Sequence, residues 1–200
     1  MVAAITEAGL ENAAIGPQIL AVGMGMPDHY YSQADLIEAF LRVWGDKAET
    51  RRRMTRLHGA VQVEGRHLAL SIPEYLGLEN FGQANDAFIR VGTQVAEKAV
   101  TEALEHACLK PTDVDALFFT TVTGLATPTI DARLVNRMGF RPNVKRTPLF
   151  GLGCVGGAAG LARMTDYLRA YPKHCALLIS VELCSLTLQL KDLSVPNLIS

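Results

Sequence analysis

The sequence predicts an α/β protein with a mainly parallel sheet between helices. Short apolar runs rich in aromatic and β-branched residues, such as residues 115–121 and 176–181, are typical of strands buried on both faces. Segments with apolar residues at helical spacing separate these runs. Alternating strands and helices favour parallel pairing with right-handed crossovers.

Composition narrows the class of protein further. The chain has 200 residues, of which 49% are hydrophobic and 20% charged, so it can bury a sizeable core and is not expected to be disordered. The net charge of −1 argues against a nucleic-acid binder held by a broad positive field. No apolar run approaches the ~18–20 residues that cross a bilayer, and residues 1–16 contain no Lys or Arg. We therefore expect a cytoplasmic protein without a membrane span or secretory signal.

The first part of the chain predicts a strand and a helix. Residues 1–16 lack apolar periodicity and are expected to be a flexible N-terminus, with one domain over residues 17–200. Residues 19–22 form an apolar run that ends at Gly23, which suits a buried strand. Residues 32–35 resemble a capping box and predict a helix. Its inward residues would be Leu36, Ile37, Phe40, Leu41 and Trp44.

From about residue 85 the pattern becomes regular. A helix that buries Phe88, Val91, Val95, Ala99 and Ala103 should end before Pro111. After the strand at 115–121, Thr127 and Pro128 are expected to begin a helix that Gly139 closes. A strand at 144–150, a helix at 156–170 and a strand at 176–181 complete the alternation.

The cysteine content indicates free thiols. Cys108, Cys154, Cys175 and Cys184 form no C-x-x-C pair and no zinc-finger spacing with histidine. We expect reduced thiols, mostly buried as small hydrophobic side chains. No metal or organic cofactor is indicated.

Cys154 stands in a different context from the other three. Residues 144–150 predict a strand, residues 156–170 a helix, and the turn between them is flanked by Gly153, Gly156 and Gly157. Glycines allow a sharp turn, and a helix N-terminus favours a thiolate over a thiol. Backbone N–H groups there could stabilise an oxyanion during acyl transfer. The alternative interpretation is a tight strand–helix corner with a passive cysteine.

Several motifs together resemble the type III polyketide synthases, the chalcone synthase-like branch of the thiolase superfamily. They are residues 63–69, residues 121–131, residues 139–146, residues 151–157 around Cys154, and Glu182, where the family also has Glu. The similarity runs from Ile19 onward, and residues 192–199 look most like bacterial alkylpyrone and alkylresorcinol synthases. The resemblance implies a thiolase-like fold, of which this chain is the first of two pseudo-repeated halves.

The resemblance also implies a reaction and its residues. An acyl-CoA starter would load onto Cys154 and be extended with malonyl-CoA by decarboxylative condensation, so CoA thioesters are substrates and no cofactor is needed. Arg53 and Arg56 fall where basic residues contact the CoA phosphates, whereas the third basic position is Ala60. Thr127 falls near a loop that reaches into a partner's cavity, which implies a homodimer. The acyl and cyclisation pocket would be lined by Val122, Thr123, Cys184 and Thr187, although Cys184 could instead be ordinary core packing.

The family's catalytic His and Asn lie beyond Ser200, so we expect no turnover by this chain alone. The partner is then a homodimer mate or a chain that supplies the C-terminal half. Two alternatives stay open: a non-catalytic half-fold that binds a relative, or a ketoacyl-synthase-type condensing enzyme that uses acyl carrier protein.

Overall fold

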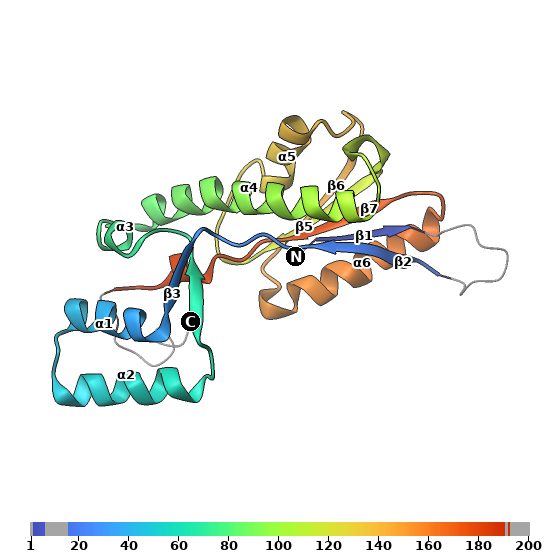
Figure 1. Cartoon of the computed structure of the whole chain (residues 1–200). Helices are drawn as coiled ribbons and strands as arrows, with labels where there is room; N and C mark the ends of the chain where they lie inside the picture. The colour runs from blue at the N-terminus through green and yellow to red at the C-terminus, as the bar shows by residue number, and fades with distance from the viewer. Residues whose placement is uncertain (1, 7–15, 191, 193–200) are drawn as a thin grey trace. The chain divides into compact units, whose positions relative to one another are not determined.

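The computed structural model describes residues 2–6, 16–190 and 192 (Figure 1). The chain divides into two compact units. The first, here the sheet unit, comprises Met1–Gly25 and Phe88–Glu182, and the second, here the smaller unit, comprises Met26–Ala87 and Leu183–Ser200. In the described ranges, no helix is both long enough and apolar enough to cross a membrane.

The sheet unit contains a five-stranded sheet in the order β2-β1-β7-β5-β6. β5 pairs in parallel with both β6 and β7, whereas β1 is antiparallel to β2 and β7. The mainly parallel sheet is therefore confirmed. Its strands are β1 (Val2–Thr6), β2 (Gln18–Gly23), β5 (Ala116–Thr121), β6 (Lys145–Phe150) and β7 (Ala176–Ser180).

Helices cover both faces of this sheet, as expected. In Figure 1, α6 lies on one face, and α4 and α5 lie on the other. The bounds are α4 (Phe81–His106), α5 (Ile130–Met138) and α6 (Gly156–Ala170), with short 3-10 turns η1 (Pro111–Asp113) and η2 (Gly153–Val155). All five apolar residues predicted to face inward on α4 are buried.

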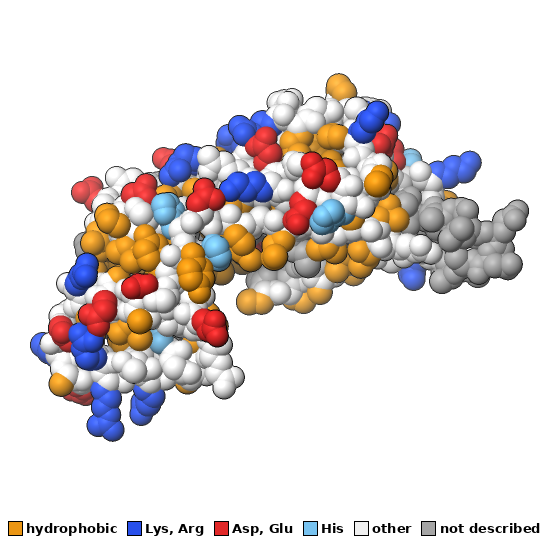
Figure 2. All heavy atoms as spheres, viewed as in Figure 1, with side chains coloured by type: hydrophobic (Ala, Val, Ile, Leu, Met, Phe, Trp, Pro, Cys, Tyr) orange, Lys and Arg blue, Asp and Glu red, His pale blue; other side chains and the backbone are white. Residues whose placement is uncertain are grey.

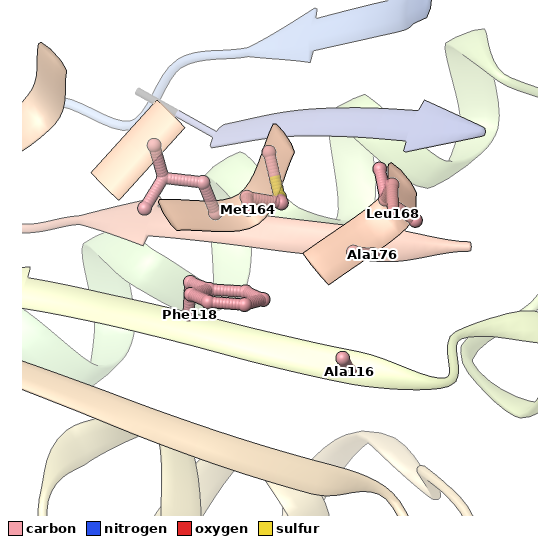
Figure 3. Packing of buried hydrophobic residues seen from close by; sticks show 6 residues of the cluster. Ala116, Phe118, Met164, Leu168 and Ala176 are labelled. Carbon is pink, nitrogen blue, oxygen red and sulfur yellow. The ribbon is translucent and has the colours of Figure 1, made fainter. Parts of the chain in front are cut away.

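The core between α6 and the sheet is built from small and large side chains in alternation. Figure 3 shows Phe118 of β5 beneath Met164 of α6, while Ala116 and Ala176 lie near Leu168. Small residues on the strands leave room for the larger helix side chains, so the two layers can pack closely. This packing holds the second half of α6 against β5 and β7.

Three expectations about the sheet unit need correction. Residues 2–6 are not a loose end, because they form β1 and pair with strands on both sides; residues 7–15 lie outside the described part of the chain. Residues 19–22 do form a strand, but Ile19 is 59% exposed, since β2 is at the edge of the sheet. The helix predicted to begin at Thr127 and Pro128 begins at Ile130, and the Thr127–Pro128 peptide bond is cis.

The smaller unit contains a two-stranded antiparallel sheet, β3 with β4, and short helices. The predicted capping box is present at the start of α1: the Asp35 N–H donates to Ser32 Oγ at 3.1 Å, and the Ser32 N–H donates to the Asp35 carboxylate at 3.2 Å. The elements are β3 (His29–Ser32), α1 (Gln33–Trp44), α2 (Ala48–Ala60), β4 (Gly65–Leu68), α3 (Ile72–Leu76) and η3 (Cys184–Thr187).

Candidate active site

Cys154 lies on the predicted strand–turn–helix elbow. β6 ends at Phe150, Cys154 is the middle residue of η2, and α6 starts at Gly156. Gly151 and Gly153 have φ values of 81° and 58°, in the left-handed region that favours glycine. A Cβ built on either glycine meets no atom within 4 Å, so backbone conformation rather than space requires glycine there. The turn leaves Cys154 exposed.

The first turn of α6 lies unusually close to the sheet. A Cβ on Gly156 would lie 2.6 Å from Thr120 Oγ1, and a Cβ on Gly160 would lie 2.6 Å from a Leu178 methyl carbon. Gly156 thus lets the helix approach the short, buried Thr120 side chain of β5, whereas at Gly160 the flexible Leu178 side chain of β7 would have to move. Since Gly156 is two residues beyond Cys154, this contact positions the elbow relative to the end of β5.

The parallel strands bring three segments to one edge of the sheet. Thr121 at the end of β5 pairs with Phe150 at the end of β6, and Thr120 pairs with Ser180 at the end of β7. The chain continues from these ends into Val122, the Cys154 elbow and Glu182. Ligands of open α/β sheets bind at this carboxyl edge.

The Glu182 carboxylate organises the segment after β5. It accepts hydrogen bonds from the Val122 N–H at 3.1 Å and from Thr123 Oγ1 at 2.8 Å, with Thr121 Oγ1 at 3.4 Å. The sequence pattern singled out Glu182 only by resemblance. The local sequence offers one sign of its role, a carboxylate directly after the buried strand predicted at 176–181. Its hydrogen-bond partners could not be recognised from the sequence, because they lie about sixty residues earlier in the chain.

The four predicted pocket residues are divided between the two units. Val122 and Thr123, in the sheet unit, are half-buried. In the smaller unit, Thr187 Oγ1 donates to the Cys184 carbonyl oxygen at 2.7 Å within η3. Their joint contribution to one pocket remains a prediction. Cys184 is exposed, so its alternative assignment as core packing is wrong.

The prediction that most thiols are buried is also wrong. Cys175 alone is buried among the four cysteines, whereas Cys108, Cys154 and Cys184 are exposed. Cys108 follows the end of α4, and Cys184 is the first residue of the short turn η3, so both lie where the chain runs at the surface. None of the four forms a disulfide, as expected.

Arg53 and Arg56 lie on α2 and are exposed. Neither forms an ion pair with any residue in the described ranges. Arg51, on the same helix, is engaged instead by Glu38 and Asp46. The two predicted arginines are thus sterically available for a phosphate.

An exposed thiol at the start of a helix can act as a nucleophile, and the helix N-terminal N–H groups can stabilise negative charge on a reacting oxygen. Phe150 and Val155, which flank the elbow, are exposed apolar side chains. Residues 2–6, 16–190 and 192 contain no group of three or more His, Cys, Asp or Glu side chains placed to hold a metal ion.

Comparisons with known proteins identify the family. Residues 6–192 match the family described as chalcone and stilbene synthases, N-terminal domain. The chain is 50% identical over 185 residues to a 1,3,6,8-tetrahydroxynaphthalene synthase of Streptomyces peucetius subsp. caesius, covering 92% of this chain and 49% of that protein. It is 28% identical over 177 residues to phloroglucinol synthase of Pseudomonas fluorescens, covering 87% of this chain and 50% of that protein.

Solved structures agree. The crystal structure of 1,3,6,8-tetrahydroxynaphthalene synthase from Streptomyces coelicolor matches with a TM-score of 0.81 and 29% identity, covering 90% of this chain and 52% of that one. The C-terminal type III polyketide synthase domain of Steely1 from Dictyostelium matches with a TM-score of 0.82 and 26% identity, covering 90% and 51%. These similarities confirm the thiolase-like fold.

The chain spans about half the length of the curated relatives named above. It belongs to the chalcone and stilbene synthase family and corresponds to the N-terminal domain of type III polyketide synthases.

Proposed function

We propose that this chain is the nucleophile-bearing half of a type III polyketide synthase that uses CoA thioesters as substrates and no cofactor. The observation that supports this most directly is the exposed Cys154 on a glycine-built strand–helix elbow, inside the region that matches the family. An exposed, unpaired thiol also suits a reducing compartment such as the cytoplasm.

In the proposed reaction, the Cys154 thiolate attacks the acyl-CoA carbonyl carbon. The carbon–sulfur bond to CoA breaks, CoA leaves as a thiolate that takes up a proton, and the acyl group is held as a thioester. Malonyl-CoA then loses carbon dioxide, and the resulting enolate carbon attacks that thioester and releases the Cys154 sulfur. N–H groups at the start of α6 would stabilise the oxyanion formed at the carbonyl.

The C-terminal half, from the same polypeptide or from a partner chain, would supply the groups that stabilise the enolate. A homodimer is proposed for the complete protein. The apolar side chains of Phe150, Leu152 and Val155, which lie beside Cys154 in the sequence, are exposed. No described residue of this chain buries them, and a C-terminal half or a partner chain would cover them.

Two product classes are proposed, and one experiment separates them. The tetrahydroxynaphthalene synthase relative favours a polyhydroxylated aromatic product. The resemblance of residues 192–199 favours an alkylpyrone or alkylresorcinol made from a long-chain acyl-CoA starter; residues 193–199 lie outside the described residues. The complete protein would be incubated with malonyl-CoA, with and without a fatty acyl-CoA, and its products identified by mass spectrometry.

The loading step tests the function without the missing half. The chain is incubated with acyl-CoA, and the acylated residue is located by peptide mass spectrometry. We expect acylation of Cys154, none in Cys154→Ala, and normal loading in Cys108→Ala, which removes another exposed thiol. Loading only from acyl carrier protein would instead support the ketoacyl-synthase alternative. Tight pairing with a relative without any acyl transfer would support the binding module.

A further inference from the structure

The short turn η3 places Cys184 and Thr187, two of the predicted pocket residues, on one side. A 3-10 helix has three residues per turn, so side chains three positions apart lie above one another. Thr187 Oγ1 donates to the Cys184 carbonyl oxygen at 2.7 Å across this turn. Leu183 and Leu186, which are also three residues apart, are buried and form the inner side. Ser185 therefore occupies the third side of η3.

The Ser185 hydroxyl connects η3 to two other segments of the smaller unit. Tyr75 OH donates to Ser185 Oγ at 2.6 Å, and the Ala69 N–H donates to the same oxygen at 3.2 Å. Tyr75 belongs to α3, and Ala69 directly follows β4. The two donors lie 110 and 116 residues earlier in the chain. A single oxygen atom thus fixes η3 against α3 and against the end of β4.

Tyr75 is itself held in a defined position. The Ser71 N–H donates to the Glu74 carboxylate at 2.8 Å, in a capping box that fixes the start of α3. Tyr75 is 9% exposed, whereas the next residue, Leu76, is 54% exposed, and hydrophobic side chains gather on the surface over α3 in Figure 2. Burial raises the pKa of Tyr75, and the hydrogen bond to Ser185 offsets part of this increase. Tyr75 therefore remains a neutral phenol that donates its O–H.

A second contact fixes the other end of the same segment. Trp44 Nε1 donates to the Leu190 carbonyl oxygen at 2.6 Å, and the Trp44 ring stacks on Phe40 of α1 with 4.8 Å between the ring centroids. Residues 185 and 190 are thus both bonded to the smaller unit, and Thr187 lies between them. The position of Thr187 therefore depends on both contacts.

We infer that Tyr75 and Ser185 are positioning residues that set the starter selectivity of the enzyme, because their hydrogen bond fixes the turn that carries Cys184 and Thr187. The inference rests on the proposed function and on the predicted place of Cys184 and Thr187 in the acyl pocket. A pocket wall that is held in one place discriminates between acyl chains, since one methylene group in a fitted pocket changes kcat/KM by about tenfold or more. A wall that moves fits short and long chains alike.

The test compares two starters in the complete protein. Hexanoyl-CoA or lauroyl-CoA is supplied with malonyl-CoA, and kcat/KM is measured for each starter. Tyr75→Phe removes only the phenol hydroxyl and should reduce the ratio of the two kcat/KM values about two- to tenfold, the range expected for one lost hydrogen bond. Tyr171→Phe removes a hydroxyl from an exposed tyrosine of the sheet unit, is the matched control and should keep the wild-type ratio.

A double variant shows whether the two side chains act through the same hydrogen bond. Ser185→Ala removes the acceptor and should also reduce the ratio of the two kcat/KM values. The double variant of Tyr75→Phe and Ser185→Ala should match Ser185→Ala alone, because the bond is already lost in the single variant.

Hydrogen exchange measures the order of the turn itself. The Leu186 N–H donates to the Leu183 carbonyl oxygen at 2.9 Å within this turn. Peptides that cover residues 183–187 should exchange about two- to tenfold faster in Tyr75→Phe than in the wild-type chain, because the turn opens more often. Peptides that cover β5 should exchange at the wild-type rate in this variant.

An equal fall in kcat/KM for both starters would overturn the inference, because it would show a general loss rather than a change in selectivity. Independent effects of the two substitutions in the double variant would do the same, as would unchanged exchange at residues 183–187 or a wild-type protein that does not distinguish the two starters. Failure of the proposed function is recognised separately, by a wild-type chain whose Cys154 is not acylated. A protein that loads Cys154 and keeps its selectivity in Tyr75→Phe would keep the function and lose only this inference.

Discussion

The Glu182 carboxylate, at the end of β7, accepts a hydrogen bond from the Val122 N–H at 3.1 Å and so ties the segment after β7 to the segment after β5. The same carboxylate also accepts from Thr123 Oγ1. A side chain from one strand thus fixes the backbone that follows its neighbour, at the edge of the sheet where Cys154 lies.

Replacing Glu182 by Ala should therefore loosen this edge. Because Val122 is only half-buried, its freed N–H can reach water, and we expect a loss of about 0.5–1.5 kcal/mol in the free energy of unfolding. Glu182→Gln, which keeps an acceptor oxygen, should lose less. Urea unfolding measures the change, and Glu105→Ala, an exposed α4 residue, is the control. Identical unfolding of Glu182→Ala and wild type would show that the contact does not stabilise the chain.

The close approach of α6 predicts opposite effects at two adjacent glycines. Ala at Gly156 would place a Cβ 2.6 Å from Thr120 Oγ1, whereas Ala at Gly157 meets no atom within 4 Å. Gly156→Ala should cost about 1–3 kcal/mol, and Gly157→Ala should stabilise by about 0.5–1 kcal/mol through helix propensity. Thermal unfolding compares the two. Thr120→Ala in the Gly156→Ala background should recover part of the loss; no recovery would contradict the assigned clash.

The ion pair between Asp131 of α5 and Arg146 of β6 should be energetically asymmetric. Arg146 Nε donates to Asp131 Oδ2 at 2.6 Å; the Asp131 side chain is fully buried, whereas that of Arg146 is 33% exposed. Arg146→Met leaves a buried carboxylate without its partner, which should cost about 3–5 kcal/mol. Asp131→Asn leaves a guanidinium that water reaches, so its cost should be smaller, about 2 kcal/mol.

Chemical denaturation of both single variants and the double variant measures this asymmetry. The double variant should be more stable than Arg146→Met, because it no longer buries an unpaired charge. A double variant less stable than either single variant would contradict the explanation.

His58 predicts a pH dependence of stability. Burial lowers the pKa of His58, and the charge of Arg66 lowers it further; both ring nitrogens are buried without a hydrogen-bond partner. The folded chain therefore favours neutral His58. The stability tied to this group is present above the unfolded pKa of about 6.5 and is lost as the pH falls through the lowered folded pKa.

As the pH falls below about 6.5, the wild type should therefore lose more unfolding free energy than His58→Leu, which has no imidazole to protonate. Exposed His106→Gln is the control and should show no comparable trend. A constant difference between wild type and His58→Leu from pH 7 to pH 5 would contradict this prediction.

The four thiols should divide into two classes of reactivity. Burial raises the pKa of the Cys175 thiol to about 11, and the nearby Asp115 and Asp113 charges add to the increase. Cys175 should thus resist alkylation near pH 8 until the chain unfolds, while Cys108, Cys154 and Cys184 react in the folded state. Peptide mapping after brief iodoacetamide treatment measures the extent of alkylation at each of the four cysteines. Labelling of Cys175 as fast as the exposed thiols would refute its assigned burial.

The parts of this protein that the sequence determined are those encoded within a few neighbouring residues. Continuous apolar runs located β5 and β7, and apolar periodicity located α4. The Ser32–Asp35 pair predicted the start of α1, and the glycines at 153, 156 and 157 predicted the turn that presents Cys154. Each of these patterns reflects either a local backbone preference or the buried face of a single helix or strand. It can therefore be recognised without knowing which distant residues it contacts.

Only the tertiary structure decided which distant segments meet. Strand pairing recruited residues 2–6 into the sheet beside β7, although nothing in their local pattern indicates a strand. Folding also gave Glu182 its hydrogen-bond donors after β5, and it paired Arg51 with the carboxylates of Glu38 and Asp46. These outcomes depend on contacts between residues far apart in the chain, whose free energy is gained only when the whole sheet or hairpin assembles.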